Sequence, residues 1–350
     1  MPVSETRTDH KAAKKNPEKI RGKSSEYDTE LLRRIEDLIR SFQRQVSDAE
    51  GSDREDSMVY GLRVLVSLAN MVLRCENVFG VEPWHIISPH APLSMPGEML
   101  LRVKDHKGES MAPYPAIMAF YENGYTAQID GILFLAALGQ FDRMRKDGAE
   151  KQVSINISAR SLRDPDFVKV TLARIESLDL NSDEKIIIEI HESTPHLTMS
   201  KKVLGLYKIL GVGFALDDVG LNMNDVIRLA EFEELAEFVK IDRHAVCAEA
   251  GESNALDQVM SFVSTLMPDA VAVAEGVKNE AHAHQISAAH PDIHYVQGLY
   301  LTSDREAFKL NFYNAGAQAK ALEKSSLSAR PPGDSSHMKD PFPERPNKGE

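Results

Sequence analysis

The chain has 350 residues, of which 42% are hydrophobic and 27% are charged. This composition supports a core for one large domain or two smaller ones, and it excludes a fully disordered or collagen-like chain. The formal net charge of -12 has the wrong sign for a general binder of polymeric nucleic acid or anionic lipid.

Cysteine content and the N-terminal sequence indicate a cytoplasmic protein. The two cysteines, Cys75 and Cys247, cannot build a disulfide framework, and the polar start of the chain has no apolar segment typical of a secretory signal. No uninterrupted apolar run approaches the 18 residues that a membrane-spanning helix needs. We therefore expect reduced thiols and no membrane span.

Two amphipathic helices are predicted ahead of the main domain, over residues 28–83. Leu31, Ile35, Leu38 and Phe42 recur at helical spacing, and a second helical pattern covers residues 57–75. Such a pair could pack on the flank of the domain or form a dimer contact. The flanking segments, residues 1–27 and 314–350, are polar or rich in Ser, Pro and Lys, so we expect them to be largely disordered.

Residues 84–313 alternate between short β-rich runs and helical patterns. The eight runs cover residues 85–88, 98–103, 153–158, 185–190, 212–217, 238–242, 270–276 and 294–300. This alternation predicts an α/β fold, a (β/α)8 TIM-type barrel preceded by the N-terminal helices. An open doubly wound sheet is the alternative, but no G-x-G-x-x-G or Walker-type loop follows a strand.

Polar residues end six of these strands in succession. They are Asn156, Glu189, the pair Asp217 and Asp218, Lys240, Glu275 and Gln297. The carboxyl ends of barrel strands converge on one face, where gathered carboxylates repel one another unless cations lie among them. Oxygen ligands of this kind suit Mg²⁺ or Mn²⁺, and two such ions about 3.5–4 Å apart would suit phosphodiester hydrolysis. Lys240 would then be a fixed positive charge or a proton-transfer partner.

Seven ordered blocks from Gly97 to Tyr300 resemble the EAL domain family. The signature Glu-Ala-Leu appears as Glu98-Met99-Leu100, followed by Leu101-Arg102. The blocks VSINISARSL, IIIEIHES, FALDDVG, FVKIDR, VAEGVK and VQGLY resemble the family's VNLSARQL, LEITES, LDDFG, LKIDR, AEGVE and QGY. The resemblance implies an EAL-like barrel that hydrolyses the bacterial second messenger cyclic di-GMP to linear pGpG.

The resemblance also implies a role for each matching residue. Metal binding falls on Glu98, Asn156, Glu189, Asp217, Asp218 and Glu275, the last of them also catalytic. Lys240 matches the lysine that orders the attacking water or acts as the base, and Gln297 belongs to the metal and water shell. Arg102 matches a contact to the ligand phosphate, and Glu192 the glutamate that steadies the loop after Asp218.

The sequence departs from the family at several places around the ligand. The family loop DDFGTGYSS reads DDVGLNMND here, Lys278 replaces a glutamate, and Tyr121 replaces another. The family's strand before the signature carries Gln-Pro against the ligand, and the nearest candidate here is Ser88-Pro89. These departures favour a second possibility, a catalytically weak or inactive receptor for cyclic di-GMP or a protein-interaction module. A metal-dependent barrel enzyme of another class is a third.

The histidines of the chain do not indicate a zinc site. His282, His284, His290 and His294 fit no standard zinc spacing and are interpreted as ordinary surface and loop residues. His191 lies beside Glu189 in the sequence and could titrate near the metals. Cyclic di-GMP is the expected small-molecule partner, and a homodimer could form through the barrel or the N-terminal helices.

Overall fold

The computed structural model of the chain describes residues 17–48, 55–74, 76–91, 96–190, 201–247, 255–298, 300–301, 308 and 312. For residues 17–28 it describes the backbone alone. The expected C-terminal tail, residues 314–350, and the first 16 residues of the expected N-terminal tail lie outside these ranges.

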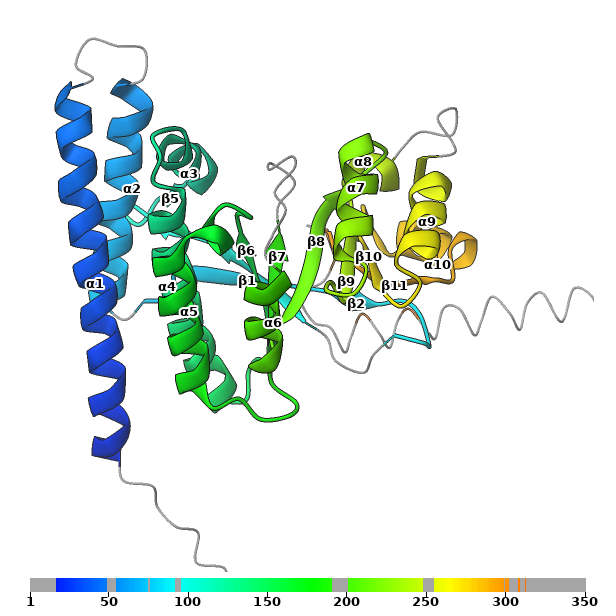
Figure 1. The fold of residues 1–350 in the computed structure, drawn as a ribbon, viewed down its shortest axis with the longest axis horizontal. Coiled ribbons are helices and arrows are strands. Elements are labelled where there is room, and N and C mark those ends of the chain that lie inside the picture. The colour runs from blue at the N-terminus through cyan, green and yellow to red at the C-terminus, as the bar shows by residue number, and fades with distance from the viewer. Residues whose placement is uncertain are drawn as a thin grey trace, which may run out of the picture.

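A nine-stranded sheet forms a nearly closed barrel, which confirms the predicted fold (Figure 1). The strand order is β1-β3-β6-β7-β8-β9-β10-β11-β2. The strands are β1 (Phe79–Pro83), β2 (His85–Ile86), β3 (Gly97–Leu101), β6 (Gln152–Ile157), β7 (Lys185–Ile190), β8 (Gly213–Val219), β9 (Phe238–Ile241), β10 (Val271–Ala274) and β11 (Ile293–Val296). Because only Trp84 separates β1 from β2, one extended segment pairs with both ends of the order.

The strand directions show where the barrel departs from an all-parallel one. β1 is antiparallel to β3 and β2 is antiparallel to β11, whereas the pairs from β3 to β11 are parallel. The eight β-rich runs all coincide with strands, and β1 is an additional strand that the sequence did not indicate. A separate hairpin pairs β4 (Val103–Lys104) with β5 (Ser110–Met111).

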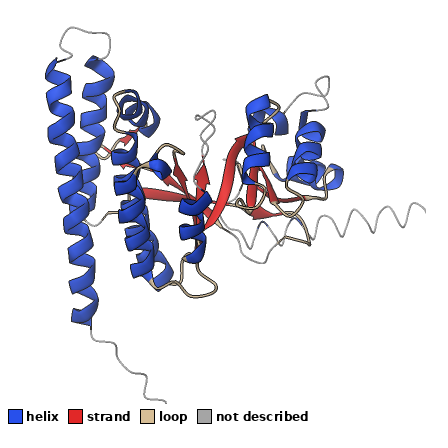
Figure 2. Cartoon of the chain, in the orientation of Figure 1, coloured by secondary structure: helices blue, strands red, loops and turns tan. Residues whose placement is uncertain are grey.

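Helices surround the sheet on its outer face (Figure 2). They are α3 (Pro113–Glu122), α4 (Thr126–Lys146), the short 3-10 helix η1 (Ser161–Arg163), α5 (Pro165–Leu178), α6 (Lys201–Ile209), α7 (Met223–Phe232), α8 (Arg243–Val246), α9 (Ala255–Leu266) and α10 (Glu280–Ala289). The main core lies between these helices and the strands. A second cluster around Trp84, Phe238 and Tyr295 fills the barrel interior, as layered side chains do in this fold.

The two N-terminal helices, α1 (Pro17–Asp48) and α2 (Glu55–Leu73), pack on the flank of the barrel (Figure 1). Ile35 and Phe42 are fully buried, and the Phe42 ring lies 4.5 Å from that of Phe120 on α3. Of the two alternatives for this segment, the structure shows flank packing. α1 begins eleven residues earlier than expected, at Pro17, and proline is well suited to the first turn of a helix.

Among the described residues, α2 is one helix whose length and hydropathy would suffice for a membrane crossing. About a third of the apolar 18-residue stretch of this helix is buried within the protein, where Met58, Leu65 and Leu68 contact the core. Buried helices of soluble proteins pass the same test, so this is weak evidence for a membrane span.

Candidate metal centre

The barrel gathers the predicted polar residues, most of them at the carboxyl ends of its strands and Glu98 at the start of β3. β3 supplies Glu98, β6 Asn156, β7 Glu189, β8 Asp217 with Asp218, and β9 Lys240, while Glu275 and Gln297 directly follow β10 and β11. The register explains part of this convergence, because Asn156 pairs directly with Glu189 across the β6–β7 ladder. Side chains at paired positions point to the same face of a sheet, here the barrel interior.

Lys240 lies at the centre of this group and is almost completely buried. Its Nζ atom donates to Glu189 Oε2 at 2.6 Å and to Glu98 Oε2 at 3.1 Å. The same ammonium forms ion pairs with Glu275 Oε1 at 2.7 Å and Asp217 Oδ1 at 3.1 Å. Four carboxylates from four positions of the barrel therefore share one positive charge.

Two side-chain amides hold Glu98 in place. Asn156 donates through Nδ2 to Glu98 Oε1 at 2.5 Å, and Gln297 donates through Nε2 to Glu98 Oε2 at 2.7 Å. Both carboxylate oxygens of Glu98 are thus held, one by a residue of the neighbouring strand β6 and the other by the residue that follows β11. The structure therefore places Glu98 in contact with Asn156, Lys240 and Gln297.

The excess of carboxylates perturbs the acid–base properties of the group. Burial raises the pKa of Glu275 to about 8, with Asp217 and Glu98 adding to the rise. Burial and the neighbouring Glu98 also raise the pKa of Glu189 well above its ordinary value. Burial alone would lower the pKa of Lys240, but the surrounding carboxylates, led by Asp217, outweigh it and raise that pKa instead.

The residues fit a divalent cation. Carboxylate oxygens of Asp217, Asp218 and Glu275 lie within 4.8 Å of one another, close enough to share an ion. Within the described part of the chain, buried oxygens of Asn156, Glu189 and Gln297 have no hydrogen-bond donor. Buried acceptors of this kind are costly unless something binds them, and all-oxygen donors suit Mg²⁺ or Mn²⁺.

The altered loop after Asp218 is held by contacts of its own. Asp218 has a left-handed backbone with φ 53°, which is unusual for a residue other than glycine. The buried Asp225 accepts from the Gly220 amide at 2.8 Å, while Asn222 caps α7. Arg228 donates to Asp225 at 3.0 Å, and at 2.9 Å to the carbonyls of Ile190 and Asp217.

We name Asp225 and Arg228 the α7 clasp, because they tie the end of β7 to the end of β8. These two strands carry Glu189 and the Asp217–Asp218 pair. Asp225 lies at the end of the segment that departs from the family motif, and Arg228 lies three residues after it.

One site residue was missed by the sequence reasoning. Glu82 on β1 pairs directly with Glu98 across the antiparallel β1–β3 ladder. Glu82-Pro83 therefore occupies the strand position for which Ser88-Pro89 had been the nearest candidate. Ser88 instead accepts from the His90 amide at 3.2 Å and donates to the Pro291 carbonyl at 3.4 Å. The Glu82-Pro83 dipeptide and its distance in sequence from Glu98 could have pointed to this position. However, the sequence FGVEP does not alternate clearly between apolar and polar residues, so it is not predicted as a strand.

The remaining predicted residues lie away from the carboxylate cluster or outside the described residues. Arg102 is exposed and lies over Gly80 of β1, where an added Cβ would stand 3.4 Å from its Cγ and Nε atoms. Tyr121 donates to the buried Asp130 at 2.6 Å, which gives it a structural role on α3. Glu192 and His191 both lie outside the described residues.

The four C-terminal histidines do not converge on one point. His284 stacks on Phe312, His290 pairs with Asp257 at 3.4 Å, and the ring nitrogens of His282 and His294 face the backbone amides of Lys278 and Ala272. Each of these histidines therefore has a different neighbour among the described residues.

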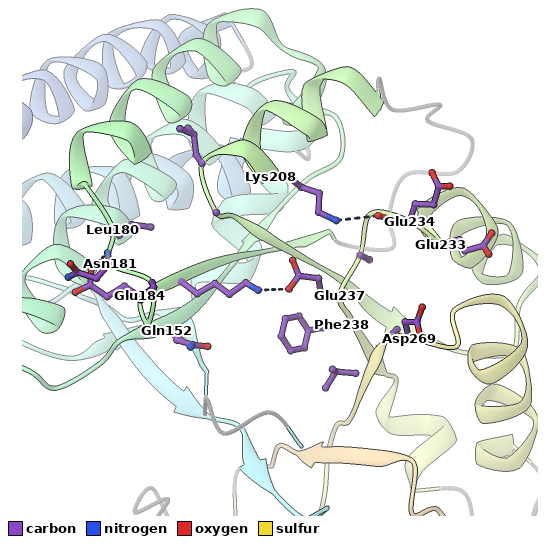
Figure 3. Close-up of a pocket in the computed structure, with 17 residues that line it drawn as sticks. Gln152, Leu180, Asn181, Glu184, Lys208, Glu233, Glu234, Glu237, Phe238 and Asp269 are labelled. Carbon is purple, nitrogen blue, oxygen red and sulfur yellow. Dashed lines mark hydrogen bonds and ion pairs between the residues drawn. The ribbon is translucent and has the colours of Figure 1, made fainter. Parts of the chain in front are cut away.

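A cavity of about 790 Å³ lies at the opposite end of the barrel (Figure 3). Its lining includes Gln152, Lys185, Phe238 and Val271, which begin β6, β7, β9 and β10. Lys185 pairs with Glu237 in this cavity, and Lys208 Nζ donates to the Glu234 carbonyl at 3.2 Å (Figure 3). Because it lies at the amino ends of the strands, this cavity is separate from the carboxylate cluster.

Solved structures of other proteins share the fold of this chain. No curated protein matches the chain in sequence. Among solved structures, the FimX EAL domain of Xanthomonas citri in complex with c-diGMP is 18% identical, with a TM-score of 0.55, and the match covers 70% of this chain and 94% of that one. The FimX EAL domain of Pseudomonas aeruginosa bound to c-di-GMP is 20% identical with a TM-score of 0.56, over 71% and 99% of the two chains.

A third structure, the PaMucR phosphodiesterase in a c-di-GMP complex, is 22% identical with a TM-score of 0.51, over 63% of this chain and 93% of that one. At these identities the structural likeness shows the fold alone. The family model described as EAL domain matches residues 92–303, which is more than half of the chain. The chain belongs to the EAL domain family.

Proposed function

We propose that this protein is a metal-dependent phosphodiesterase that hydrolyses cyclic di-GMP to linear pGpG in bacterial second-messenger signalling, in the cytoplasm. The observation that carries the proposal is the buried Lys240 among four carboxylates at the carboxyl end of an EAL barrel. Its support from known proteins is that solved structures of the same fold include c-di-GMP complexes, one of them that of the PaMucR phosphodiesterase.

The metal ligands of the proposal are the residues with oxygens directed into the cluster. Asp217, Asp218 and Glu275 would hold one Mg²⁺ or Mn²⁺, and a second ion would use the buried oxygens of Asn156 and Glu189 that have no donor, with Glu98 as a further carboxylate beside them. When bound, two divalent ions would supply Lewis acidity and offset the charge that develops on the phosphoryl oxygens.

Lys240 would hold the attacking water by donating a hydrogen bond through Nζ. Because its carboxylate neighbours raise the pKa of Lys240, the side chain stays protonated, which suits orientation of the water better than acceptance of its proton. Gln297 would keep Glu98 and the water shell oriented through its side-chain amide. Arg102 at the rim would pair with a phosphate of the ligand, and Glu192 would steady the loop after Asp218.

The alternative is a receptor that binds cyclic di-GMP and turns it over slowly or not at all. The altered loop favours it, because residues 221–225, which end at Asp225 of the α7 clasp, differ from the family's Thr-Gly-Tyr-Ser-Ser segment beside the proposed metal ligands. The acidic residues around Lys240 favour the enzyme, since a receptor for an anionic ligand gains nothing from carboxylates without cations.

Incubation of the purified protein with cyclic di-GMP and Mn²⁺ or Mg²⁺ tests the proposal, with the nucleotides separated by chromatography. We expect pGpG to appear, and to be lost in Glu98→Gln and in EDTA. Glu176→Gln on the exposed face of α5 is the matched control and should retain activity. Binding of cyclic di-GMP without pGpG would establish the receptor, and no binding would refute both.

A further inference from the structure

Glu82 faces the metal centre from β1, a strand that supplies none of the ligands proposed above. It pairs with Glu98 across the β1–β3 ladder, and directly opposed side chains in such a ladder have Cβ atoms about 4.5–5.5 Å apart. Gln297, which donates to Glu98, also hydrogen-bonds to Glu82. Glu82 is thus joined to the same group as the signature glutamate.

This placement is unfavourable in the absence of a cation. Like charges directly opposite each other destabilise a strand pair. Glu82 is partly buried, and burial together with the neighbouring Glu98 raises its pKa. Lys240 acts on Glu82 only at a distance, because its short contacts go to Glu98, Glu189, Asp217 and Glu275. A divalent cation beside Glu98 would relieve this repulsion.

Glu82 also lies on the same face of the strand pair as Arg102. Gly80 and Glu82 are two residues apart on β1, so both face the same side of the sheet. The Arg102 side chain packs over Gly80 on that side. Electrostatic attraction links Arg102 to Glu82. An anionic ligand that approaches Arg102 therefore meets a carboxylate beside it, unless that carboxylate is neutralised.

We propose that Glu82 is a further carboxylate of the metal centre, which strengthens binding of a divalent cation and makes binding of an anionic ligand depend on that cation. The first part stands on the geometry of β1 and β3. The second part rests on the proposed function, since it concerns a phosphate ligand at Arg102.

Calorimetric titration with Mn²⁺ alone, without nucleotide, tests the first part. Glu82→Gln keeps the shape and the amide contact while removing the charge, and we expect it to bind Mn²⁺ about tenfold more weakly than the wild type, the range seen for outer-shell partners of metal ligands. In EDTA the variant should melt at a higher temperature than the wild type, because the repulsion with Glu98 is gone. Glu176→Gln is again the matched control. Equal Mn²⁺ affinity in wild type and Glu82→Gln would overturn the proposal.

Titration with cyclic di-GMP tests the second part. In EDTA, Glu82→Gln should bind the nucleotide several-fold more tightly than the wild type, and saturating Mn²⁺ should close that gap. A gap of the same size with and without Mn²⁺ would contradict the dependence on the cation. If Mn²⁺ binding weakens as expected but neither protein binds cyclic di-GMP, the proposed function fails while the metal role of Glu82 stands.

Discussion

Lys240 sets the charge balance of the site at the scale of single residues. Replacement by methionine keeps much of the volume but leaves Glu98, Glu189, Asp217 and Glu275 without their shared cation. We expect the free energy of unfolding in EDTA to fall by about 3–5 kcal/mol, the usual cost of removing one partner from a buried ion pair. Urea denaturation at pH 8 measures this, and an unchanged midpoint would contradict it. Mn²⁺ should restore part of the loss.

Glu275 makes stability depend on pH in a definite direction. Its pKa in the folded protein is about 8, above the ordinary value of 4.5, so folding favours the protonated form. The stability that this provides is complete below the ordinary pKa and is lost as the pH rises through about 8. Glu189 acts in the same direction. Lys240, whose pKa is raised above 10.5, stays charged in both states over this range.

We therefore expect the melting temperature in EDTA to fall between pH 5 and pH 9, and Mn²⁺ to reduce that fall because the cation favours the ionised carboxylates. Glu275→Gln should show a shallower decline in EDTA. Differential scanning calorimetry across this range gives the comparison. A melting temperature that rises with pH in EDTA would show that these carboxyls are not held in the protonated form.

Site residues near the ends of β-rich runs could be predicted from the sequence, whereas Glu82 could not. Glu189, Asp217 and Lys240 end buried runs of β-rich sequence, so both their strand and their convergence on one face could be inferred. Glu82 could not be found in this way. Its strand is short, contains a proline and is antiparallel, and its partner Glu98 is set by a pairing that no local pattern encodes.

The α7 clasp is a contact between elements. Arg228 bridges the backbone ends of β7 and β8, the strands of Glu189 and the Asp217–Asp218 pair. The sequence showed only that the loop departs from the family motif, because a side chain that binds two distant carbonyl groups leaves no periodic signal. The structure adds the finding that the loop is anchored, through Asp225 and its bond to the Gly220 amide.

Removal of the clasp should weaken metal binding as well as the fold, because Asp225 also loses its buried partner. In Arg228→Met the two carbonyls lose their donor, so we expect Mn²⁺ affinity to fall 10–100-fold, as for other changes next to metal ligands. Arg163→Met in the exposed part of η1 is the matched control and should bind Mn²⁺ like the wild type. Isothermal titration provides the affinities. Wild-type affinity in a folded Arg228→Met protein would show that the clasp does not position the ligands.

The N-terminal helices are part of the whole molecule's core. Phe42 is fully buried on α1, and its ring packs against Phe120 on α3 and Tyr125 before α4. The sequence predicted both helices from their apolar spacing but left open whether they pack on the barrel or on a second copy. That choice depends on α3 and α4, which present the complementary apolar surface and lie far along the chain.

Truncation of the Phe42 side chain should affect the stability of the fold without affecting the metal centre. Phe42→Ala should lower the free energy of unfolding by about 3–5 kcal/mol, as for other buried aromatic residues. Arg40→Ala, which removes exposed ion pairs on the same helix, should cost at most about 1 kcal/mol. Denaturant unfolding compares the two. Equal, small effects would mean that α1 is dispensable for the fold, and Mn²⁺ affinity should be unchanged in both variants.

The measurement that tests the central claim most directly is the anomalous scattering of Mn²⁺ in crystals of the protein grown with that metal. The proposed phosphodiesterase requires cations held by these carboxylates. We predict anomalous peaks beside Asp217, Asp218 and Glu275, with Glu98 and Glu189 completing the group. Peaks confined to other places, with Lys240 still bound to all four carboxylates at saturating Mn²⁺, would contradict the assignment of this cluster as a metal centre.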